Sequence, residues 1–406
     1  MKSIIRLTAI ALLFAGLAHA KSPMREEVLR DAARRSGVLP LEDILIVNDA
    51  RLSAVGKDLF ESPLLSLNSD TSCQTCHIDR FGSADGLPNA VGTGGRGEGP
   101  ARLMAGGGAI VPRNTLPFWG RGTRGFDTFF WDGKVKATQD GIVSQFGPSA
   151  PSADALVVAV HLPVVEIREL VRRDSNVSAN YEVEAAEAAA DIYRILTDRV
   201  RKDASLGPRL AAASGKTREA IEFQDIAVAI AAFIREKFAV RKTRFDEFMF
   251  KGGKLSANEV AGGLIFYGKG RCSNCHSGTL MSDLRFYAMP FEQLGFGKNG
   301  FGVDYGRYNV TKSPDDLYRF RTPPLINVAE TAPYTHSGSI PDLDAVIRAH
   351  VDPLADYDGR ARTPVQRKED LVRFLAWEGQ SQLSQPLSEK EVGSLVAFLK
   401  TLSTPD

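Results

Sequence analysis

Apolar residues recur at helical spacing near the end of the chain. The residues of this run are Val392, Leu395, Val396, Leu399 and Leu402, which follow one another at spacings of one or three residues. This spacing predicts a helix with one buried face. The pattern S-x-x-E, from Ser388 to Glu391, is typical of a helix N-terminus, and it occurs again from Ser256 to Glu259. We therefore expect a helix to begin at each of these serines.

Two further segments, residues 181–200 and 219–238, have the composition and period of helices. Strand patterns are weak along the chain. Residues 92–117 and 295–324 are rich in Gly and Pro, which predicts long ordered loops. The expected fold is mainly α-helical with much irregular structure.

The first twenty residues differ from the rest of the chain. Lys2 and Arg6 precede an uncharged apolar stretch that starts at Leu7 and is followed by Ala18-His19-Ala20, the pattern of a cleavable secretory signal. A membrane anchor would need about 20 apolar residues. We expect a signal peptide over residues 1–20 and a mature chain that begins near Lys21, has no membrane span and is exported to the periplasm of a Gram-negative source.

Length and charge narrow the classes of function. A chain of 406 residues with 43% hydrophobic and 24% charged residues is long enough for two domains with cores of their own. A net charge of +1 argues against a nucleic-acid-binding protein, because no dominant positive field would attract phosphates. Small molecules or another protein are the better partners.

All four cysteines belong to two C-x-x-C-H units, which comprise Cys73, Cys76 and His77, and Cys272, Cys275 and His276. Two cysteines at this spacing place both sulfurs on one side of a helical turn, where they can bond to a haem while the following imidazole ligates its iron. A redox dithiol would not require the histidine twice, and a four-cysteine zinc site usually has closer pairs. Two covalently bound c-type haems are therefore predicted.

The segments that lead into the two C-x-x-C-H units are also similar in sequence; with the units they span residues 56–77 and 263–276. Each half of the chain is predicted to be one cytochrome c-like domain with one haem. The first would span residues 21–250, including the connecting helices, and the second residues 251–406. The boundary falls around Lys251-Gly252-Gly253.

The remaining histidines decide how the two irons differ. Outside the signal and the two haem units, the chain has only His161, His336 and His350. Met104 is the only methionine between His77 and His161, so the first iron is poorly supplied with a second protein ligand. An iron with an open position can bind peroxide, whereas an iron with two protein ligands transfers electrons.

The sequence resembles the bacterial dihaem cytochrome c peroxidases, and more closely their MauG/MbnH-like branch. The resemblance rests on six motifs in family order: SCQTCH (72–77), RNTLPFW (113–119), FFWDGKV (129–135), LPVVEIREL (162–170), KGRCSNCHSG (269–278) and RTPPLINVAETAPYTHSGSIPDLDAVIRAH (321–350). It implies two cytochrome c-like domains with a calcium ion between them. The calcium contacts implied are Asn114 and, through backbone carbonyls, Thr331 and Pro333, which suits the preference of this cation for oxygen.

The resemblance also implies roles around the first haem. Pro163 would lie above the iron, and Glu169 would be the acid that delivers a proton to the leaving oxygen of peroxide, since burial raises the pKa of a carboxyl group. Glu166 is instead expected to be a solvated charge on a helix face. Trp131 would lie between the haems and relay electrons; the alternative is an ordinary core aromatic residue.

The chain departs from the family pattern at three positions. Ala159 replaces a glutamine, and His161 either approaches the first iron or is a supporting or surface residue. His350 stands where the family has a methionine or tyrosine as distal ligand of the second haem, with Tyr357 as the nearby alternative. His336 is expected to donate a hydrogen bond rather than to ligate iron.

These expectations combine into a peroxide-dependent oxidoreductase. Hydrogen peroxide would react at the haem of His77, and the haem of His276 and His350 would store or transfer oxidising equivalents. In the MauG-like branch these oxidise aromatic side chains of a partner protein. The alternatives are a peroxidase that takes electrons from a small cytochrome or copper protein, and a non-enzymatic dihaem electron carrier.

Overall fold

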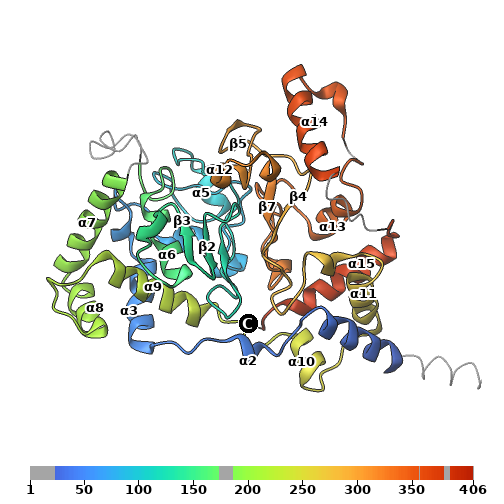
Figure 1. The fold of residues 1–406 in the computed structure, drawn as a ribbon, viewed down its shortest axis with the longest axis horizontal. Helices are drawn as coiled ribbons and strands as arrows, with labels where there is room; N and C mark the ends of the chain where they lie inside the picture. Colours follow the sequence, from blue (N-terminus) through green and yellow to red (C-terminus); the bar gives the residue numbers. More distant parts are fainter. Residues whose placement is uncertain (1–22, 173–185, 356, 379–384, 406) are drawn as a thin grey trace, which may run out of the picture.

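The structure is a computed structural model that describes residues 23–172, 186–355, 357–378 and 385–405. The predicted signal peptide, residues 1–20, lies outside the described residues, as does the start of the helix predicted over residues 181–200. The N-terminal and C-terminal halves of the chain lie side by side along the long axis, with short strands where they meet (Figure 1).

The N-terminal half is built around five helices: α3 (Ala50–Glu61), α6 (Ala155–His161), α7 (Ala186–Lys202), α8 (Leu206–Ser214) and α9 (Phe223–Lys237). Helix α9 is buried over much of its surface, because alanines such as Ala227 and Ala231 let neighbouring helices approach closely. A Cβ atom at Gly56 of α3 would lie 1.9 Å from the carbonyl oxygen of Ala229, so only glycine permits this contact. The first hydrophobic core forms where these helices meet.

A small antiparallel sheet borders this core. Its strands lie in the order β1 (Thr128–Phe129), β2 (Val135–Thr138) and β3 (Gly141–Ser144), and Phe129 pairs with Val135. The FWDGK motif forms the turn between β1 and β2. Arg307 of the C-terminal half donates to the carbonyl oxygens of Asp132 and Gly133 in this turn, at 2.8 Å each, so the turn that carries Trp131 is tied to that half.

The C-terminal half has a second core between α11 (Ala257–Tyr267) and α15 (Glu389–Leu399). A Cβ atom at Gly262 would lie 1.9 Å from the carbonyl oxygen of Ser394, which explains how closely the two helices pack. Both predicted helix starts are confirmed, since Ser256 and Ser388 form capping boxes with Glu259 and Glu391.

Residues 23–35 form a helix that joins the second core, although the sequence suggested that everything from residue 21 to 250 belongs to the first domain. Leu29 and Ala33 of this helix are fully buried there, together with Phe245 of α10 (Arg244–Phe250). The helix packs directly on α10 and α11: Arg30 donates to the carbonyl oxygen of Phe248 at 3.1 Å, and a Cβ atom at Gly263 would lie 2.7 Å from the Leu29 side chain. The boundary near residue 251 therefore separates the two haem-attachment units in the sequence, but residues 23–35 pack with the C-terminal half.

The remaining elements are short or lie at the edges. They are α2 (Leu41–Ile44), α4 (Cys73–Cys76), α5 (Pro100–Met104), β4 (Phe286–Ala288), β5 (Phe296–Gly297), β6 (Gly300–Phe301), α12 (Tyr308–Thr311), β7 (Arg319–Arg321), α13 (Leu343–Val351) and α14 (Pro364–Glu378). Strand β4 pairs with β7, and β5 pairs with β6. Of the two Gly/Pro-rich segments, residues 92–117 are mostly irregular apart from α5, as predicted, whereas residues 295–324 alternate short strands and helical turns with loops. In the described part of the chain, no helix is long and apolar enough to cross a membrane.

A buried ion cluster joins the two halves. The guanidinium of Arg113 donates two hydrogen bonds to the carboxylate of Asp304, at 2.8 and 2.9 Å, and a third to Asp132 at 2.6 Å. All three side chains are at most 9% exposed. Breaking such a pair would leave a buried charge uncompensated, so the cluster specifies how the halves are docked.

Candidate functional site

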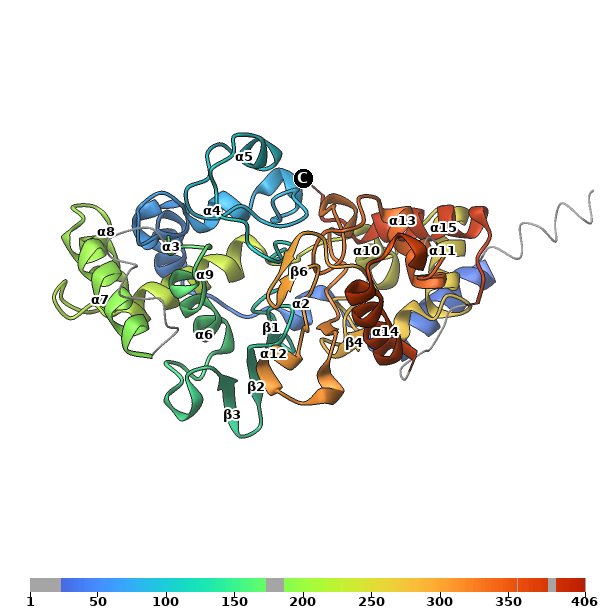
Figure 2. The same ribbon diagram turned by 90° about the horizontal axis from the view of Figure 1, so that it is seen from above.

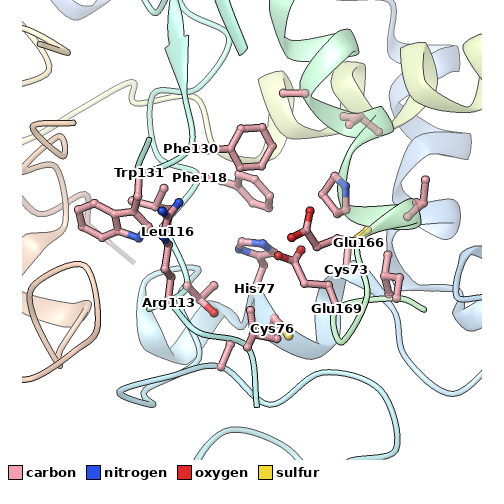
Figure 3. A pocket seen from close by; sticks show the side chains of 18 of the residues that line it. Cys73, Cys76, His77, Arg113, Leu116, Phe118, Phe130, Trp131, Glu166 and Glu169 are labelled. Carbon is pink, nitrogen blue, oxygen red and sulfur yellow. The ribbon is translucent and has the colours of Figure 1, made fainter. Parts of the chain in front are cut away.

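A cavity in the N-terminal half contains the first C-x-x-C-H unit. Cys73, Cys76 and His77 lie at its floor, while Pro163, Glu166 and Glu169 line another wall. Figure 3 shows the carboxylates of Glu166 and Glu169 pointing toward the His77 ring. The structure thus brings together the residues that the sequence assigned to the first haem site.

Local contacts orient the His77 imidazole. Its Nδ1 atom lies 2.9 Å from the carbonyl oxygen of Ser83, which can only accept, so Nδ1 carries the proton and Nε2 keeps its lone pair. The ring also stacks on Phe118 at a centroid distance of 3.8 Å. Burial, and then the charge of Arg121, lower the pKa of His77 to about 3. The imidazole is therefore neutral, which is the form that ligates a metal.

Arg121 provides an independent test of whether a haem fits this cavity. It lines the cavity, is 7% exposed, and donates one hydrogen bond to the carbonyl oxygen of Leu116. Its Nε atom is buried without a partner among the described residues. A buried cation with a free donor needs an anionic group, and a haem propionate would supply one. The cavity residues fit a haem in charge as well as in attachment chemistry.

The second unit has the same arrangement around its histidine. Cys272 begins the short helix η6 (Cys272–Asn274), and His276 Nδ1 lies 3.0 Å from the carbonyl oxygen of Met281. Burial, and then the charge of His350, lower the pKa of His276 to about 4. The two imidazoles are therefore close enough to interact electrostatically.

The two candidate distal residues of the second site face different surroundings. On α13, His350 Nδ1 donates to the carbonyl oxygen of Val346 at 2.7 Å, which leaves its Nε2 lone pair available, and the ring meets Phe291 edge to face. The hydroxyl of Tyr357 instead donates to Asp370 of α14 at 3.2 Å. This geometry favours His350 over Tyr357 as a ligand.

The segment that carries Glu169 is clamped by a glycine of the facing loop. Arg168 has a positive φ of 80°, and its carbonyl oxygen accepts a hydrogen bond from the backbone of Thr93 at 3.0 Å. A Cβ atom at Gly92 would lie 1.7 Å from that same oxygen. The loop therefore holds the backbone on which Glu169 sits.

The two glutamates of this segment have opposite electrostatic environments. Burial, followed by the negative charge of Glu166, raises the pKa of Glu169 to about 7. Burial also opposes ionisation of Glu166, but the ammonium groups of Lys134 and Lys298 outweigh it and hold its pKa at about 2. Glu166 is thus not the solvated helix-face charge that the sequence suggested, because two lysines draw it into the cavity wall.

His161 lies beside this segment but packs away from the cavity. It is 4% exposed, its Nδ1 donates to the carbonyl oxygen of Val157 at 2.8 Å, and its ring meets Phe146, Tyr193 and Phe223 edge to face. It does not line the cavity. These contacts support a packing role for His161 rather than iron ligation.

Comparison with known sequences agrees with this geometry. Residues 50–255, which hold the first C-x-x-C-H unit and the distal segment, match the family described as "Di-haem cytochrome c peroxidase". The chain belongs to the di-haem cytochrome c peroxidase family.

Relatives in this family extend the likeness over both halves. The chain is 27% identical over 335 residues to the cytochrome c peroxidase Ccp of Escherichia coli, a match that covers 80% of this chain and 58% of the relative. It is 27% identical over 354 residues to the methylamine utilization protein MauG of Methylorubrum extorquens, covering 86% and 77%. The chain therefore spans less than two thirds of the length of the first relative.

Solved structures support the fold. A MauG-like protein associated with microbial copper homeostasis superposes with a TM-score of 0.62 at 24% identity, covering 90% of this chain and 92% of that chain. The predicted fold class, mainly helical with two cytochrome c-like domains and long loops, is confirmed. Membership of the di-haem peroxidase family also implies haem cofactors at the two C-x-x-C-H units.

In this member of the family, Trp131 lies between the first cavity and the C-terminal half. Its indole Nε1 donates to the carbonyl oxygen of Asn114 at 2.9 Å, and its own carbonyl accepts from the backbone of Arg321 at 2.8 Å. The side chain is buried and forms part of the cavity wall (Figure 3). This position suits a relay toward the second half.

The residues implied in calcium binding lie close together. Asn114 Nδ2 donates to the carbonyl oxygen of Pro333 at 2.6 Å, while its Oδ1 atom is buried without a partner among the described residues. The hydroxyl of Thr331 donates to the carbonyl oxygen of Val328 at 3.3 Å. The described residues contain no group of three or more His, Cys, Asp or Glu that could hold a metal. An amide oxygen and backbone carbonyls would therefore have to supply such a site.

His336 lies in the protein interior. It is buried and stacks on Phe320 at a centroid distance of 3.8 Å. The cavity residues that sequence reasoning missed are Arg121, Lys134 and Lys298. Lys134 belongs to the FFWDGKV motif and could have been noticed there, but nothing in the sequence links Lys298 to a cavity of the other half.

Proposed function

We propose that this chain is a periplasmic, peroxide-dependent dihaem oxidoreductase that passes oxidising equivalents to aromatic side chains of a partner protein. The observation that carries the proposal is the asymmetry of the two sites. A carboxyl group with a raised pKa, that of Glu169, faces His77, whereas an imidazole, that of His350, is near His276. Two equal electron-transfer sites would not need this difference.

A haem iron with an open position supplies peroxide binding and reduction, and a six-coordinate haem iron supplies electron transfer. The side chains of this chain supply the proton movements. Glu169, as a carboxylate, accepts a proton from hydrogen peroxide and returns it to the oxygen that leaves as water. A pKa of about 7 suits both steps at neutral pH. Pro163, which has no side-chain donor or ligand, leaves the space beside Glu169 free for peroxide.

The choice of partner rests on His350. A neutral imidazole stabilises ferric haem better than a thioether does, so a His276/His350 pair would have a lower potential than a His/Met pair. That weakens the case for electron input from a high-potential donor. The resemblance to the MauG-like branch supports oxidation of a partner protein, whereas likeness to proteins named cytochrome c peroxidases supports the alternative, electron supply by a small cytochrome or copper protein.

We also propose a calcium ion between the halves, held by Asn114 Oδ1 and by the backbone carbonyls of Thr331 and Pro333. The support is the orphaned Oδ1 atom and the nearness of the Pro333 carbonyl. Waters would complete the oxygen shell that calcium requires.

Peroxide and a reduced small cytochrome c test the proposed partner. We expect the diferric protein to react with peroxide but to oxidise the cytochrome only slowly. The oxidising equivalents should therefore persist on the protein even when the reduced cytochrome is present. Rapid, sustained oxidation of the cytochrome would favour the peroxidase instead. A protein that ignores peroxide would be the dihaem electron carrier.

Replacing Trp131 by phenylalanine tests the relay. The variant should bind both haems, but the spectral change at the second haem should lag far behind the change at the first, because phenylalanine is much harder to oxidise than indole. The measurement is stopped-flow absorbance after mixing with peroxide. Trp119→Phe is the matched control, since Trp119 packs on Phe238 and does not line the cavity. Equal lag times in the two variants would contradict the relay.

A further inference from the structure

We propose that Lys298 is a positioning residue of the first site: it crosses from the C-terminal half to clamp Glu166 against Lys134, and so makes proton transfer by Glu169 depend on how the two halves are docked. The inference rests on the proposed role of Glu169. It adds a residue of the C-terminal half to an acid–base site that the sequence places wholly in the N-terminal half.

Lys298 lies in the turn of the β5–β6 hairpin. The hairpin sits at the junction of the two halves in both views (Figures 1 and 2). The next residue, Asn299, anchors the turn to the C-terminal half, because its Oδ1 accepts from the backbone of Tyr305 at 2.8 Å and its Nδ2 donates to Asn309 at 2.8 Å. Asn89 of the N-terminal half donates to the carbonyl oxygen of Leu294 at 2.7 Å, at the base of the hairpin. Lys298 is therefore presented from a turn held on both sides.

The two oxygens of Glu166 are taken by different lysines. Lys298 Nζ lies 2.9 Å from Oε1, and Lys134 Nζ lies 3.0 Å from Oε2. The backbone carbonyl of Glu166 also accepts from the backbone of Glu169 at 3.2 Å, so both glutamates belong to one turn. The clamp on Glu166 is thus rigidly connected to the residue that would transfer the proton.

Burial distinguishes this cluster from ordinary surface ion pairs, which contribute little to stability. The side chains of Lys134, Glu166 and Lys298 are 14%, 19% and 26% exposed. All three line the same cavity as Glu169. In such a partly buried site, charges act on one another with much less solvent screening.

The charges that act on Glu169 have known signs. Glu166 raises its pKa, whereas Lys134, Lys298 and Arg113 lower it, and burial has the largest effect. Removing Lys298 leaves Glu166 paired with Lys134 and removes one cation, so the pKa of Glu169 should rise. Removing the charge of Glu166 leaves two lysines without their anion, so the pKa of Glu169 should fall. A cluster that served only to stabilise the fold would not produce opposite shifts.

The test is an isotope-edited infrared titration of the Glu169 carboxyl group in the diferric, haem-loaded protein, with no peroxide present. Lys298→Met should move the midpoint upward by about one pH unit, and Glu166→Gln should move it downward by about one unit or more. Asn89→Ala, which loosens the hairpin without touching the cavity, should move it upward by less. Glu169→Gln should remove the titrating band and thereby identify it.

Lys216→Met is the matched control, since Lys216 also pairs with a carboxylate, that of Asp225 at 2.8 Å, but does not line the cavity. Its midpoint should equal that of the unmodified protein. An unchanged midpoint in Lys298→Met, shifts of the same sign in Lys298→Met and Glu166→Gln, or no shift in Asn89→Ala would each overturn the proposal. The reading needs no turnover, so it can fail in a protein that still reacts with peroxide, and it can succeed in one that does not.

Discussion

Replacing Glu169 by glutamine is expected to slow the reaction with hydrogen peroxide by about 10²- to 10⁴-fold, the usual contribution of a positioned acid–base group. Glutamine has nearly the same shape as glutamate but cannot accept and return a proton. The haems should remain attached, because none of the attachment residues changes. The measurement is the rate of the haem absorbance change in a stopped-flow instrument with peroxide in excess.

The same experiment has a pH signature. The shuttle begins with the carboxylate, so the rate should rise as the pH passes through the pKa of Glu169, at about 7. Between pH 6 and pH 8 the ionised fraction of such a group increases roughly tenfold. In Glu169→Gln the profile should be flat over this range.

Glu236→Gln is the control for both measurements, because Glu236 is an exposed residue of α9 that does not line the cavity. Its rate and its profile should match those of the unmodified protein. A rate in Glu169→Gln within about threefold of the unmodified value would contradict the role given to this carboxyl group.

Replacing His350 by alanine is expected to convert the second haem from low-spin to high-spin and to raise its reduction potential. An imidazole ligand would be lost, and axial ligands span a range of roughly 0.8 V in haem proteins, so a rise of about 0.1 V or more is expected. The fold should tolerate the change, since His350 is exposed on α13 and the hydrogen bond from its Nδ1 atom to Val346 stays within that helix. Electron paramagnetic resonance and a redox titration give the two readings.

Two further variants sharpen the ligand assignment. His350→Met should keep the second haem low-spin but raise its potential, because a thioether stabilises ferric iron less than imidazole does. Tyr357→Phe should change neither the spin state nor the potential, since the Tyr357 hydroxyl bonds to Asp370. Loss of the low-spin signal in Tyr357→Phe, with none in His350→Ala, would exchange the two assignments.

Much of the fold could be predicted because its signals are local. The capping boxes at Ser256 and Ser388 and the helical period after each of them depend only on neighbouring residues, and both helices are present. The haem-attachment units are equally local signals, since the spacing of Cys73, Cys76 and His77 alone predicts covalent haem attachment.

What could not be predicted depends on contacts between distant parts of the chain. The helix over residues 23–35 packs on the second core, whereas Leu41 and Ile44, which follow it in the sequence, pack in the first core. Glu166 looked like a solvated charge, because its partners Lys134 and Lys298 come from another turn and from the other half. Glu166 and Glu169 lie three residues apart in the same segment, so the sequence alone cannot tell which of them is the acid. The positions of the lysines around them in the structure distinguish the two.

We expect the two haem sites to be unequal, with an open iron at His77 and a six-coordinate iron at His276. Electron paramagnetic resonance of the diferric protein, before and after peroxide, tests it most directly. We expect one high-spin and one low-spin signal, and a change in the spectrum when peroxide is added. Two low-spin signals that do not respond to peroxide would contradict it.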